Sequence, residues 1–460
     1  MRGEGEGSRP VARRGKGAAG LLFSRRFGPY FAMQALSAFN DSAIKNALVL
    51  LIAYGAARGE RLSAELLIPL AGGIFILPFF LASATAGEIA DRWDKARLIR
   101  LIKLVELAVM AAAGFAVVAA RVSALLLLLV VMGIEATFLG PIKYAILPEI
   151  LLPEELLLGN ALVESGTFLA ILLGTIAGIA VTLSEGGLIV ALGLNAVALL
   201  AWGSSLWIPP TGAADPTARI RWNVVAATFE VSREAMREKA SFRVILGISW
   251  FWLAGATYLS QFPSFVRFTL GSAASVVTLF LTIFSVGIAL GSLLCNRILR
   301  GRIRLATVPW GALGIALFSS DLWLASPTPD LIRGPAAGRL LPLLSFLALP
   351  AHWRIIVDLL GLSICGGVFV VPLYALLQAM TAREHRARVI GANNIVNAAA
   401  MALSAGATVA LLAAGVSVPG LFLLTGIGTV AIAFLFRPGA PSLRAYSGTA
   451  KESARETSRE

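Results

Sequence analysis

Four charged side chains lie within segments that are otherwise apolar, and their types and spacing suit the binding of charged groups. Asp41 and Lys45 are four residues apart in the first long apolar run, so a helix would place them on one face. Lys143 and Glu164 lie in two later apolar runs. A charge in the middle of a membrane helix costs several kcal/mol, so it needs a partner or a water-filled cavity. These residues therefore predict a polar site within the membrane.

Each of these residues also has a structural interpretation. Asp41 and Lys45 could neutralise each other as an i,i+4 pair. Lys143, about four residues from one end of its apolar run, could extend to the lipid headgroups. Glu164 could hydrogen-bond Asn160 and brace two neighbouring helices. The sequence leaves both interpretations open for each residue.

Two further acids, Glu106 and Glu135, lie in apolar runs with no obvious partner nearby in the sequence. Either of them could carry a proton, and either could equally serve as a water-bridged structural group.

The sequence offers little for enzymatic chemistry. It has two histidines, His352 and His385, and neither begins an H-x-x-x-x-D acyltransferase motif. It also lacks the G-x-x-x-x-G-K-[ST] loop that binds nucleotide phosphates. Cys295 and Cys365 lie in apolar runs, which provides neither a disulfide framework nor a C-x-x-C metal site. We expect no enzyme activity, no cofactor and no metal site.

The composition places the chain in the membrane. Hydrophobic residues make up 57% of it and charged residues only 14%, whereas soluble proteins carry about 25% charged residues. The net charge of +13 comes from Lys and Arg that concentrate at one side of the apolar runs. That distribution indicates membrane topology and attraction to anionic membrane lipids, and it argues against nucleic-acid binding.

The apolar runs predict an all-α membrane protein with twelve transmembrane helices, because no run shows the alternation of a membrane β-barrel. A polar segment divides the runs six and six. The predicted parts are a basic N-tail (1–27), a first six-helix bundle (28–210), a linker (211–241), a second bundle (242–437) and a C-tail (438–460). The predicted spans lie near 28–55, 66–90, 97–120, 123–147, 158–183, 187–209, 243–266, 274–297, 305–324, 354–380, 389–414 and 417–436.

The basic residues also predict an orientation. The tails and the linker are rich in Lys and Arg, which favours both termini in the cytoplasm. The basic N-tail precedes a long apolar run without a clear cleavage site, so we expect a retained first helix rather than a signal peptide. The linker has apolar residues at helical spacing and predicts an amphipathic helix along the inner membrane face. The end of the C-tail (451–460) is polar, and we expect it to be disordered.

Two segments separated by half the chain repeat each other, at 140–178 and 371–407. Each is an apolar run, a short polar break and a second apolar run, which is typical of transporters built from two similar halves. The corresponding pairs are Pro141/Pro372, Tyr144/Tyr374, Gly159/Gly391 and Glu164/Asn397.

The loop between the second and third spans carries Gly87, Asp91, Arg92 and Arg97. It resembles the G-x-x-x-D-R/K-x-G-x-R/K loop of the major facilitator superfamily, with Asp94 where a second Gly is expected. The resemblance implies two pseudo-symmetric six-helix bundles, with Asp91 facing the positive end of a helix in the other half. The second half has a copy with Arg297 and Arg300, in which Cys295 replaces the Asp.

Two further motifs narrow the resemblance. They are Phe39-Asn40-Asp41-x-x-x-Lys45-Asn46 in the first span and Gly140-Pro-x-Lys143-Tyr144 in the fourth. Both are similar to the bacterial lysophospholipid transporter family, and closest to members fused to an acyltransferase and an acyl–acyl carrier protein synthetase. The chain departs from them because no acyltransferase follows the twelfth span. It also lacks the Arg that stand-alone members tend to carry in helix 7.

The resemblance implies a transporter of lysophospholipids in the bacterial inner membrane, acting as a monomer, with a cytoplasmic acyltransferase or acyl-carrier-protein synthetase as a possible partner. A phosphoethanolamine headgroup carries an anion and a cation, which Lys143 or Lys45 and Asp41 or Glu164 could meet. The alternatives are a proton-coupled antiporter of drugs or amphiphiles, using Asp41 or Glu135, and a non-transporting scaffold for an acyltransferase. The predicted substrate residues are Asn40, Asp41, Lys45, Asn46, Lys143, Tyr144, Glu164, Tyr374, Asn393 and Asn397, and the predicted gate residues are Gly87, Asp91, Arg92, Arg97, Arg297 and Arg300.

Overall fold

The computed structural model describes residues 17–53, 64–119, 121–183, 187–326 and 340–436. These ranges are helical apart from short connections and the longer non-helical stretch 207–223, with one isolated bridge between Ser272 and Leu341. Helices satisfy every backbone donor and acceptor within one segment, which is what a bilayer requires. The predicted all-α fold is confirmed. The predicted C-tail and most of the N-tail lie outside the described residues.

Long helices follow one another in each half of the chain. The first half contains α2 (Gly28–Ala53), α3 (Ala64–Arg92), α4 (Lys95–Val118), α5 (Val122–Ala145), α7 (Leu156–Leu183) and α8 (Gly187–Leu206). The second half contains α10 (Lys239–Ser264), α11 (Ala274–Leu299), α12 (Val308–Ala325), α14 (Pro350–Met380), α15 (Arg386–Ala413) and α16 (Val418–Ala433).

Ten helices within the described ranges are long and apolar enough to cross a membrane. They coincide with ten of the predicted spans. The other two, α2 and α8, lie at the positions of the first and sixth predicted spans. The chain is therefore a multi-pass membrane protein.

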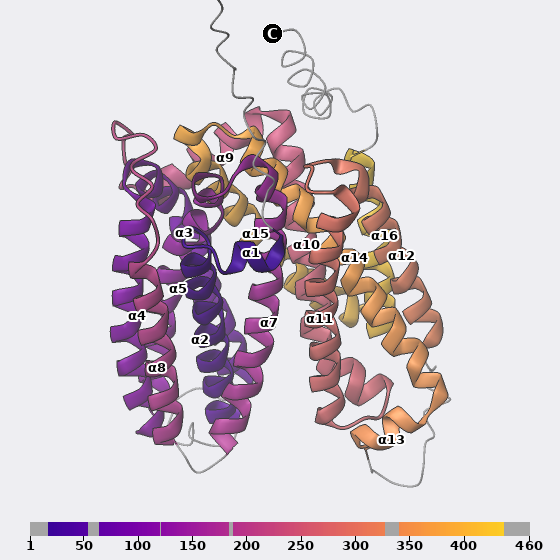
Figure 1. Cartoon of the computed structure of the whole chain (residues 1–460). Helices are drawn as coiled ribbons and strands as arrows, with labels where there is room; N and C mark the ends of the chain where they lie inside the picture. Colours follow the sequence, from indigo (N-terminus) through magenta and orange to yellow (C-terminus); the bar gives the residue numbers. More distant parts are fainter. Residues whose placement is uncertain (1–16, 54–63, 120, 184–186, 327–339, 437–460) are drawn as a thin grey trace, which may run out of the picture.

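Several short elements connect the long helices. They include α1 (Ala18–Leu22), α6 (Leu147–Ile150), α13 (Leu343–Ala348), and the linker helix α9 (Val224–Arg237), together with one π-helical turn (Phe265–Thr269) and four 3-10 turns (Pro153–Glu155, Leu305–Thr307, Arg383–His385 and Phe434–Phe436). Side-chain caps define some helix starts, because Asp94 accepts from the Arg97 amide and Asn223 from the Ala226 amide. Helix α9 lies at the upper end of Figure 1 and α13 at the opposite end.

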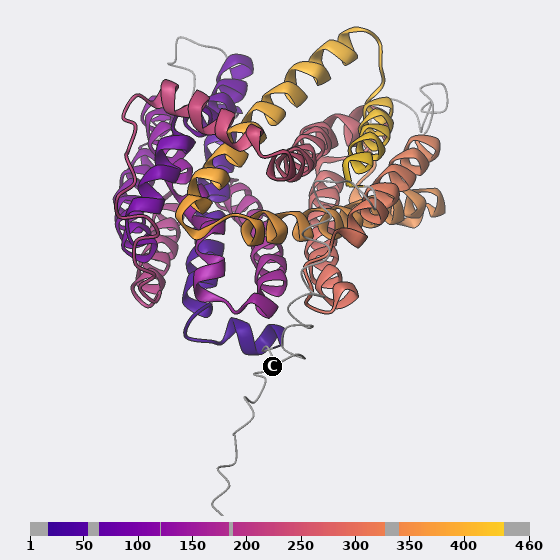
Figure 2. The same ribbon diagram turned by 90° about the horizontal axis from the view of Figure 1, so that it is seen from above.

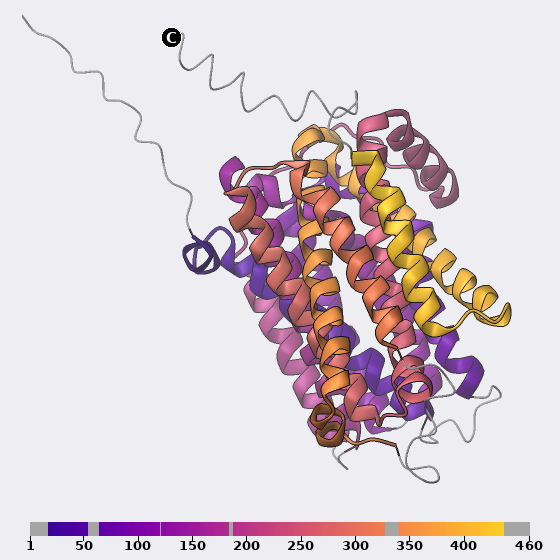
Figure 3. The same cartoon turned by 90° about the vertical axis from the view of Figure 1, so that its right-hand side faces the viewer.

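The helices form two groups that meet along a central seam. Seen along the bundle in Figure 2, the first-half helices gather on one side and the second-half helices on the other, except that α15 reaches across to α3 and α5. Contacts across the seam join α3 to α15, α7 to α11 and α5 and α7 to α14. Figure 3 shows helices of the second half, among them α12, α14 and α16, on the face toward the viewer.

The repeat seen in the sequence has a matching form in three dimensions. In each copy a proline lies inside the first helix, Pro141 in α5 and Pro372 in α14. A 3-10 turn then precedes the second helix, at Pro153–Glu155 before α7 and at Arg383–His385 before α15. Both copies lie at the seam between the two groups.

Candidate functional site

A cavity of about 430 Å³ lies between the two groups of helices, within the range of about 300–1,000 Å³ that is usual for small-molecule sites. Its polar wall comes mainly from α2. Gln34, Ser37, Asp41 and Lys45 succeed one another there at one-turn spacing and all line the cavity. The remainder of the lining is largely apolar and comes from α3, α5, α7, α10, α14 and α15.

Asp41 and Lys45 do not form an ion pair, since no contact within 4.0 Å joins them in the described part of the chain. The Lys45 ammonium instead lies 3.6 Å from the centre of the Phe75 ring, a cation–π contact. Both side chains line the cavity. They therefore face the space that a ligand would fill.

Lys143 points into the cavity rather than toward the membrane surface. Its Nζ donates to Thr167 Oγ1 at 2.9 Å, and Gln34 Nε2 donates to the same oxygen at 2.7 Å. The Tyr30 hydroxyl donates to the Lys143 carbonyl at 2.5 Å. These bonds fix the lysine at the cavity, which Asp41 also lines.

Four predicted substrate residues lie behind the cavity wall instead of lining it. Asn40 donates to the Leu194 carbonyl at 3.2 Å. Asn46 donates to the Ser42 carbonyl. The remaining two, Glu164 and Asn393, are fully buried.

Glu164 does brace two helices, although with a different partner from the one predicted. It accepts a hydrogen bond from the Tyr144 hydroxyl, which joins α7 to α5. Asn160 is engaged elsewhere: it and Gln378 exchange two hydrogen bonds of 2.8 Å across the seam.

The floor of the cavity is a pair of aromatic rings from the two halves. Tyr144 and Tyr374, which correspond in the repeat, stack with their centres 4.1 Å apart and their planes 7° apart. The Trp252 indole donates to the Tyr374 hydroxyl at 2.8 Å. Asn397, also at the cavity, accepts from Ser249 at 2.7 Å. The stacked rings and the Asn160–Gln378 pair both join the first half of the chain to the second.

Asp91 ties the end of α3 to the start of α15 in the other half. Its carboxylate accepts from the Ala387 amide at 2.9 Å, the Arg388 amide at 3.1 Å and Arg388 Nε at 3.1 Å. The first amides of a helix have no partner within the helix and carry its positive dipole, so they suit a carboxylate. Asp91 itself is fully buried. We call this contact the gate.

Two glycines allow the backbones of α3 and α15 to touch at the gate. A Cβ atom on Gly87 would lie 2.7 Å from the Ala387 carbonyl oxygen, and one on Gly391 would lie 2.5 Å from the Ser83 carbonyl oxygen. Any larger residue would force the two helices apart.

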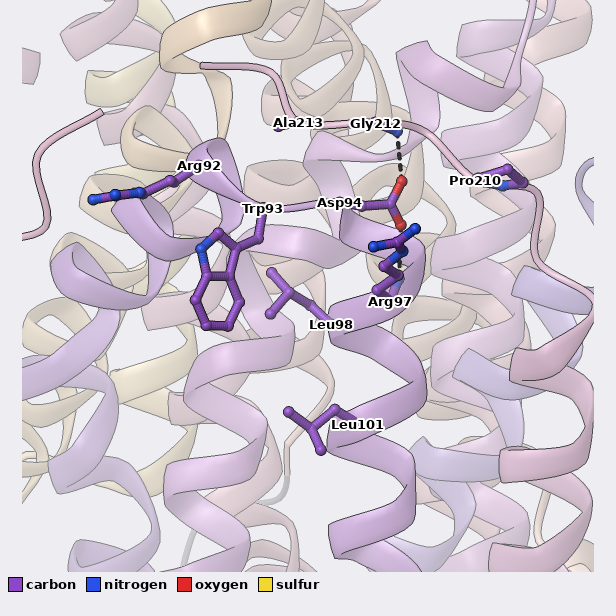
Figure 4. Close-up of a pocket in the computed structure, with 9 residues that line it drawn as sticks. All are labelled: Arg92, Trp93, Asp94, Arg97, Leu98, Leu101, Pro210, Gly212 and Ala213. Atoms are coloured by element: carbon purple, nitrogen blue, oxygen red, sulfur yellow. Dashed lines mark hydrogen bonds between the residues drawn. The ribbon is translucent and has the colours of Figure 1, made fainter. Parts of the chain in front are cut away.

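The linker reinforces the gate. Glu88 accepts from the Arg221 amide at 2.7 Å, and Asp215 lies 3.4 Å from Arg388. Asp94 holds the start of the linker through the Thr211 and Gly212 amides, as Figure 4 shows for Gly212. Burial raises the pKa of the Asp94 carboxyl, but the hydrogen bonds from these amides and from Arg97 outweigh it and hold the pKa below its ordinary value.

The predicted basic residues of the gate do not converge on it. Arg92 donates to the Ala218 carbonyl at 3.2 Å. In Figure 4, Arg92 and Arg97 lie on different sides of a surface pocket of about 650 Å³. Arg97, Arg297 and Arg300 form no side-chain ion pair with any residue that the structure describes. The cation of the gate is Arg388, which the sequence did not single out.

The sequence also missed the partner of the two isolated acids. Lys103, which was not singled out from the sequence, is buried and lies between Glu106 and Glu135. The three-residue spacing of Lys103 and Glu106 was a usable signal. Nothing local linked either residue to Glu135, which lies on the next helix.

The fold and the cavity define a membrane transport protein of two similar halves. The sequence profile of the Major Facilitator Superfamily matches residues 30–337, and the chain belongs to this superfamily. Among its relatives is the lysophospholipid transporter LplT of Cronobacter sakazakii (strain ATCC BAA-894), 29% identical over 385 residues, which are 82% of this chain and 85% of that protein. The LplT of Yersinia pestis (strain Pestoides F) is 28% identical over 379 residues, 82% of each chain. The resemblance seen in the motifs is confirmed.

Solved structures show the same fold at lower identity. The human organic anion transporter MFSD10 aligns with a TM-score of 0.68 and 15% identity, covering 90% of this chain and 99% of that one. The proton:xylose symporter XylE aligns with a TM-score of 0.65 and 14% identity, covering 92% and 97%.

Proposed function

We propose that the chain moves lysophospholipids, such as lysophosphatidylethanolamine, from the outer to the inner leaflet of a bacterial inner membrane by alternating access. The observation that carries the proposal is the cavity wall on which Asp41, Lys45 and Lys143 all face one space. The names of the relatives support the same substrate class.

The physics of the substrate requires such a wall. A zwitterionic headgroup cannot cross hydrocarbon without polar partners, whereas its acyl tail favours lipid by about 0.8 kcal/mol per methylene. The headgroup therefore travels in the cavity and the tail stays in the bilayer, through a lateral opening between the halves. The largely apolar remainder of the cavity lining suits the first methylenes of the tail.

Each charge of the headgroup has a partner on the wall. Lys143 and Lys45 bind the phosphate, because lysine is a common phosphate ligand that acts as a point charge. Asp41 binds the ammonium. Glu164 is the weaker candidate for that role, because it is buried behind Tyr144 and bonded to it.

In the proposed cycle, the gate controls release of the substrate at the cytoplasmic side. With the tails and linker in the cytoplasm, the Asp91 contact closes the cytoplasmic end and the cavity loads from the outer face. Release then requires three contacts to open together: Asp91 with the start of α15, the Tyr144–Tyr374 stack, and the Asn160–Gln378 pair. Rocking of the two halves would achieve this. An acyltransferase at the inner face could then restore the second acyl chain.

The experiment is transport of labelled lysophosphatidylethanolamine by the purified chain in proteoliposomes, with extraction of the outer leaflet by albumin. We expect protein-dependent movement without an imposed gradient. The double variant Lys45→Gln/Lys143→Gln should lose it, and Arg354→Gln, which alters an exposed ion pair away from the cavity, should retain it. No movement would favour a scaffold, and strict dependence on a proton gradient would favour an antiporter.

A further inference from the structure

Behind the cavity wall, three helices enclose a charge cluster that the proposed headgroup site does not use. Lys103 on α4 donates to Glu135 Oε1 on α5 at 2.8 Å and also to Glu106 Oε2. It donates to Ser37 Oγ on α2 at 2.5 Å, and that hydroxyl donates to Glu106 at 2.8 Å. The side chains of Lys103, Glu106 and Glu135 are 1%, 1% and 7% exposed. We call this group the Lys103 cluster.

The charges of the Lys103 cluster do not balance. It holds one ammonium and two carboxyl groups, so full ionisation leaves a net charge of −1 in a site closed to water. A buried unpaired charge costs several kcal/mol. The two carboxyls are also neighbours of each other, and Glu106 Oε1 has no hydrogen-bond partner among the residues described. Two ionised carboxylates can only accept hydrogen bonds, whereas a proton on one of them turns it into a donor to the other.

Among the side chains that the structure describes, no second cation forms an ion pair with Glu106 or Glu135. On α2, Asp41 and Lys45 face the same region and carry opposite charges. Helix α8, which packs on α4 and α2, has no Asp, Glu, Lys or Arg in its sequence. The described charged side chains of the other helices packed on α2 and α5 lie elsewhere. Glu88, Asp91 and Arg92 of α3 and Arg386 and Arg388 of α15 lie at or beside the gate, and Glu164 of α7 is bonded to Tyr144. Glu149 of α6 pairs with Lys95, and Arg354 and Asp358 of α14 interact with Asp321.

We propose that the Lys103 cluster is a binding site for one exchangeable proton, and that this proton leaves when a ligand ammonium enters the cavity beside Asp41. The second half of this statement rests on the proposed function. One carboxyl O–H bond breaks, the proton passes to water, and the cluster keeps both carboxylates. The added positive charge of the ammonium at the cavity wall compensates the charge that the proton removed.

The structure provides the connection between the two sites. Ser37 belongs to both, because its hydroxyl contacts Lys103 and Glu106 while the residue lines the cavity. Asp41 lies one turn further along α2 and interacts electrostatically with both Lys103 and Glu106. A proton released from the cluster therefore has a polar exit past Ser37 into the cavity.

The first test needs no substrate. Infrared difference spectra of the purified chain, titrated between about pH 5 and about pH 9, report the C=O band of a protonated buried carboxyl. We expect one band that is present in the unaltered chain and absent from both Glu135→Gln and Glu106→Gln. Each variant leaves one Lys103 with one carboxylate, a neutral pair that needs no proton. The exposed control Glu230→Gln should keep the band. Its persistence in both cluster variants, or its absence from the unaltered chain, overturns the proton site.

The second test adds lysophosphatidylethanolamine to the chain in weakly buffered solution with a pH indicator, and follows binding in parallel by intrinsic tryptophan fluorescence. We expect release of up to one proton per ligand bound, and no release from Glu135→Gln although it still binds. If the unaltered chain and Glu135→Gln both bind the ligand and release the same number of protons, the coupling between ligand and proton is refuted but the proton site is not. Absence of binding refutes the proposed function, while the infrared result still decides the proton site.

Discussion

Replacing Asp91 with Asn removes the charge that holds the gate without changing the size of the side chain. The carboxylate accepts three hydrogen bonds, from the Ala387 amide, the Arg388 amide and Arg388 Nε. An Asn side chain retains one acceptor oxygen and turns an NH₂ group toward these donors. Hydrogen bonds to a charged group contribute about 1.5–3 kcal/mol each, and rehydration of the carboxylate in the open state offsets part of that sum. We therefore expect the closed state to lose about 2–4 kcal/mol relative to the open state.

A loss of this size changes the equilibrium between the two states roughly 30-fold to 700-fold. This equilibrium can be followed in a chain that lacks its two native cysteines and carries Ser42→Cys in the cavity wall. The rate at which an impermeant maleimide labels the new cysteine reports how often the cavity is open to that face. Asp91→Asn should slow labelling from the face opposite the gate, leave ligand binding in place and slow transport. The matched control is Asp215→Asn, whose carboxylate is a more distant partner of Arg388 at 3.4 Å and should change the equilibrium far less, because solvent screens an exposed charge pair. Equal labelling rates for the two variants would refute the gate.

Three further substitutions test the cavity and the cluster behind it. Asp41→Asn should abolish most transport at matched membrane insertion, because the ammonium loses its counter-charge, and the buried acid control Asp358→Asn should not. Lys143→Arg should retain part of the uptake and Lys143→Gln far less, because a phosphate contact needs the charge; equal uptake by Lys, Arg and Gln chains would move the phosphate site to Lys45. Lys103→Met should cost about 3–5 kcal/mol in unfolding free energy by leaving buried carboxyls without their cation. Removing the exposed Arg354–Asp321 pair by Arg354→Met should cost much less, because solvent screens it. Similar melting shifts for Lys103→Met and Arg354→Met would contradict this ranking.

The helices could be predicted because a membrane imposes their length and composition. About 20 apolar residues are needed to cross the hydrocarbon, and the predicted spans 274–297 and 354–380 lie within α11 and α14. The repeat was equally visible, since Pro141 and Pro372 keep their places in α5 and α14. These features depend on local sequence alone.

The contacts at the site depend on packing between distant segments, and there sequence reasoning reached only part of the answer. Asp91 was recognisable from its motif, but its partner Arg388 lies 297 residues away along the chain. Lys103 lies within the predicted span 97–120 but was not singled out, although it is only three residues from Glu106. Glu135 reaches it only because α4 and α5 pack together.

The closed gate requires that Gly87 and Gly391 have no side chain, because each lies directly against the backbone of the facing helix. A methyl group added at either glycine would clash with the facing backbone in the closed gate. In the open gate the two helices are apart, so the same methyl group would cause no such clash. Random substitutions at these two glycines should therefore raise the population of the state with the gate open. Gly391→Ala is, for the same reason, a simple tool for trapping that arrangement for structure determination or inhibitor screening, and it requires no ligand.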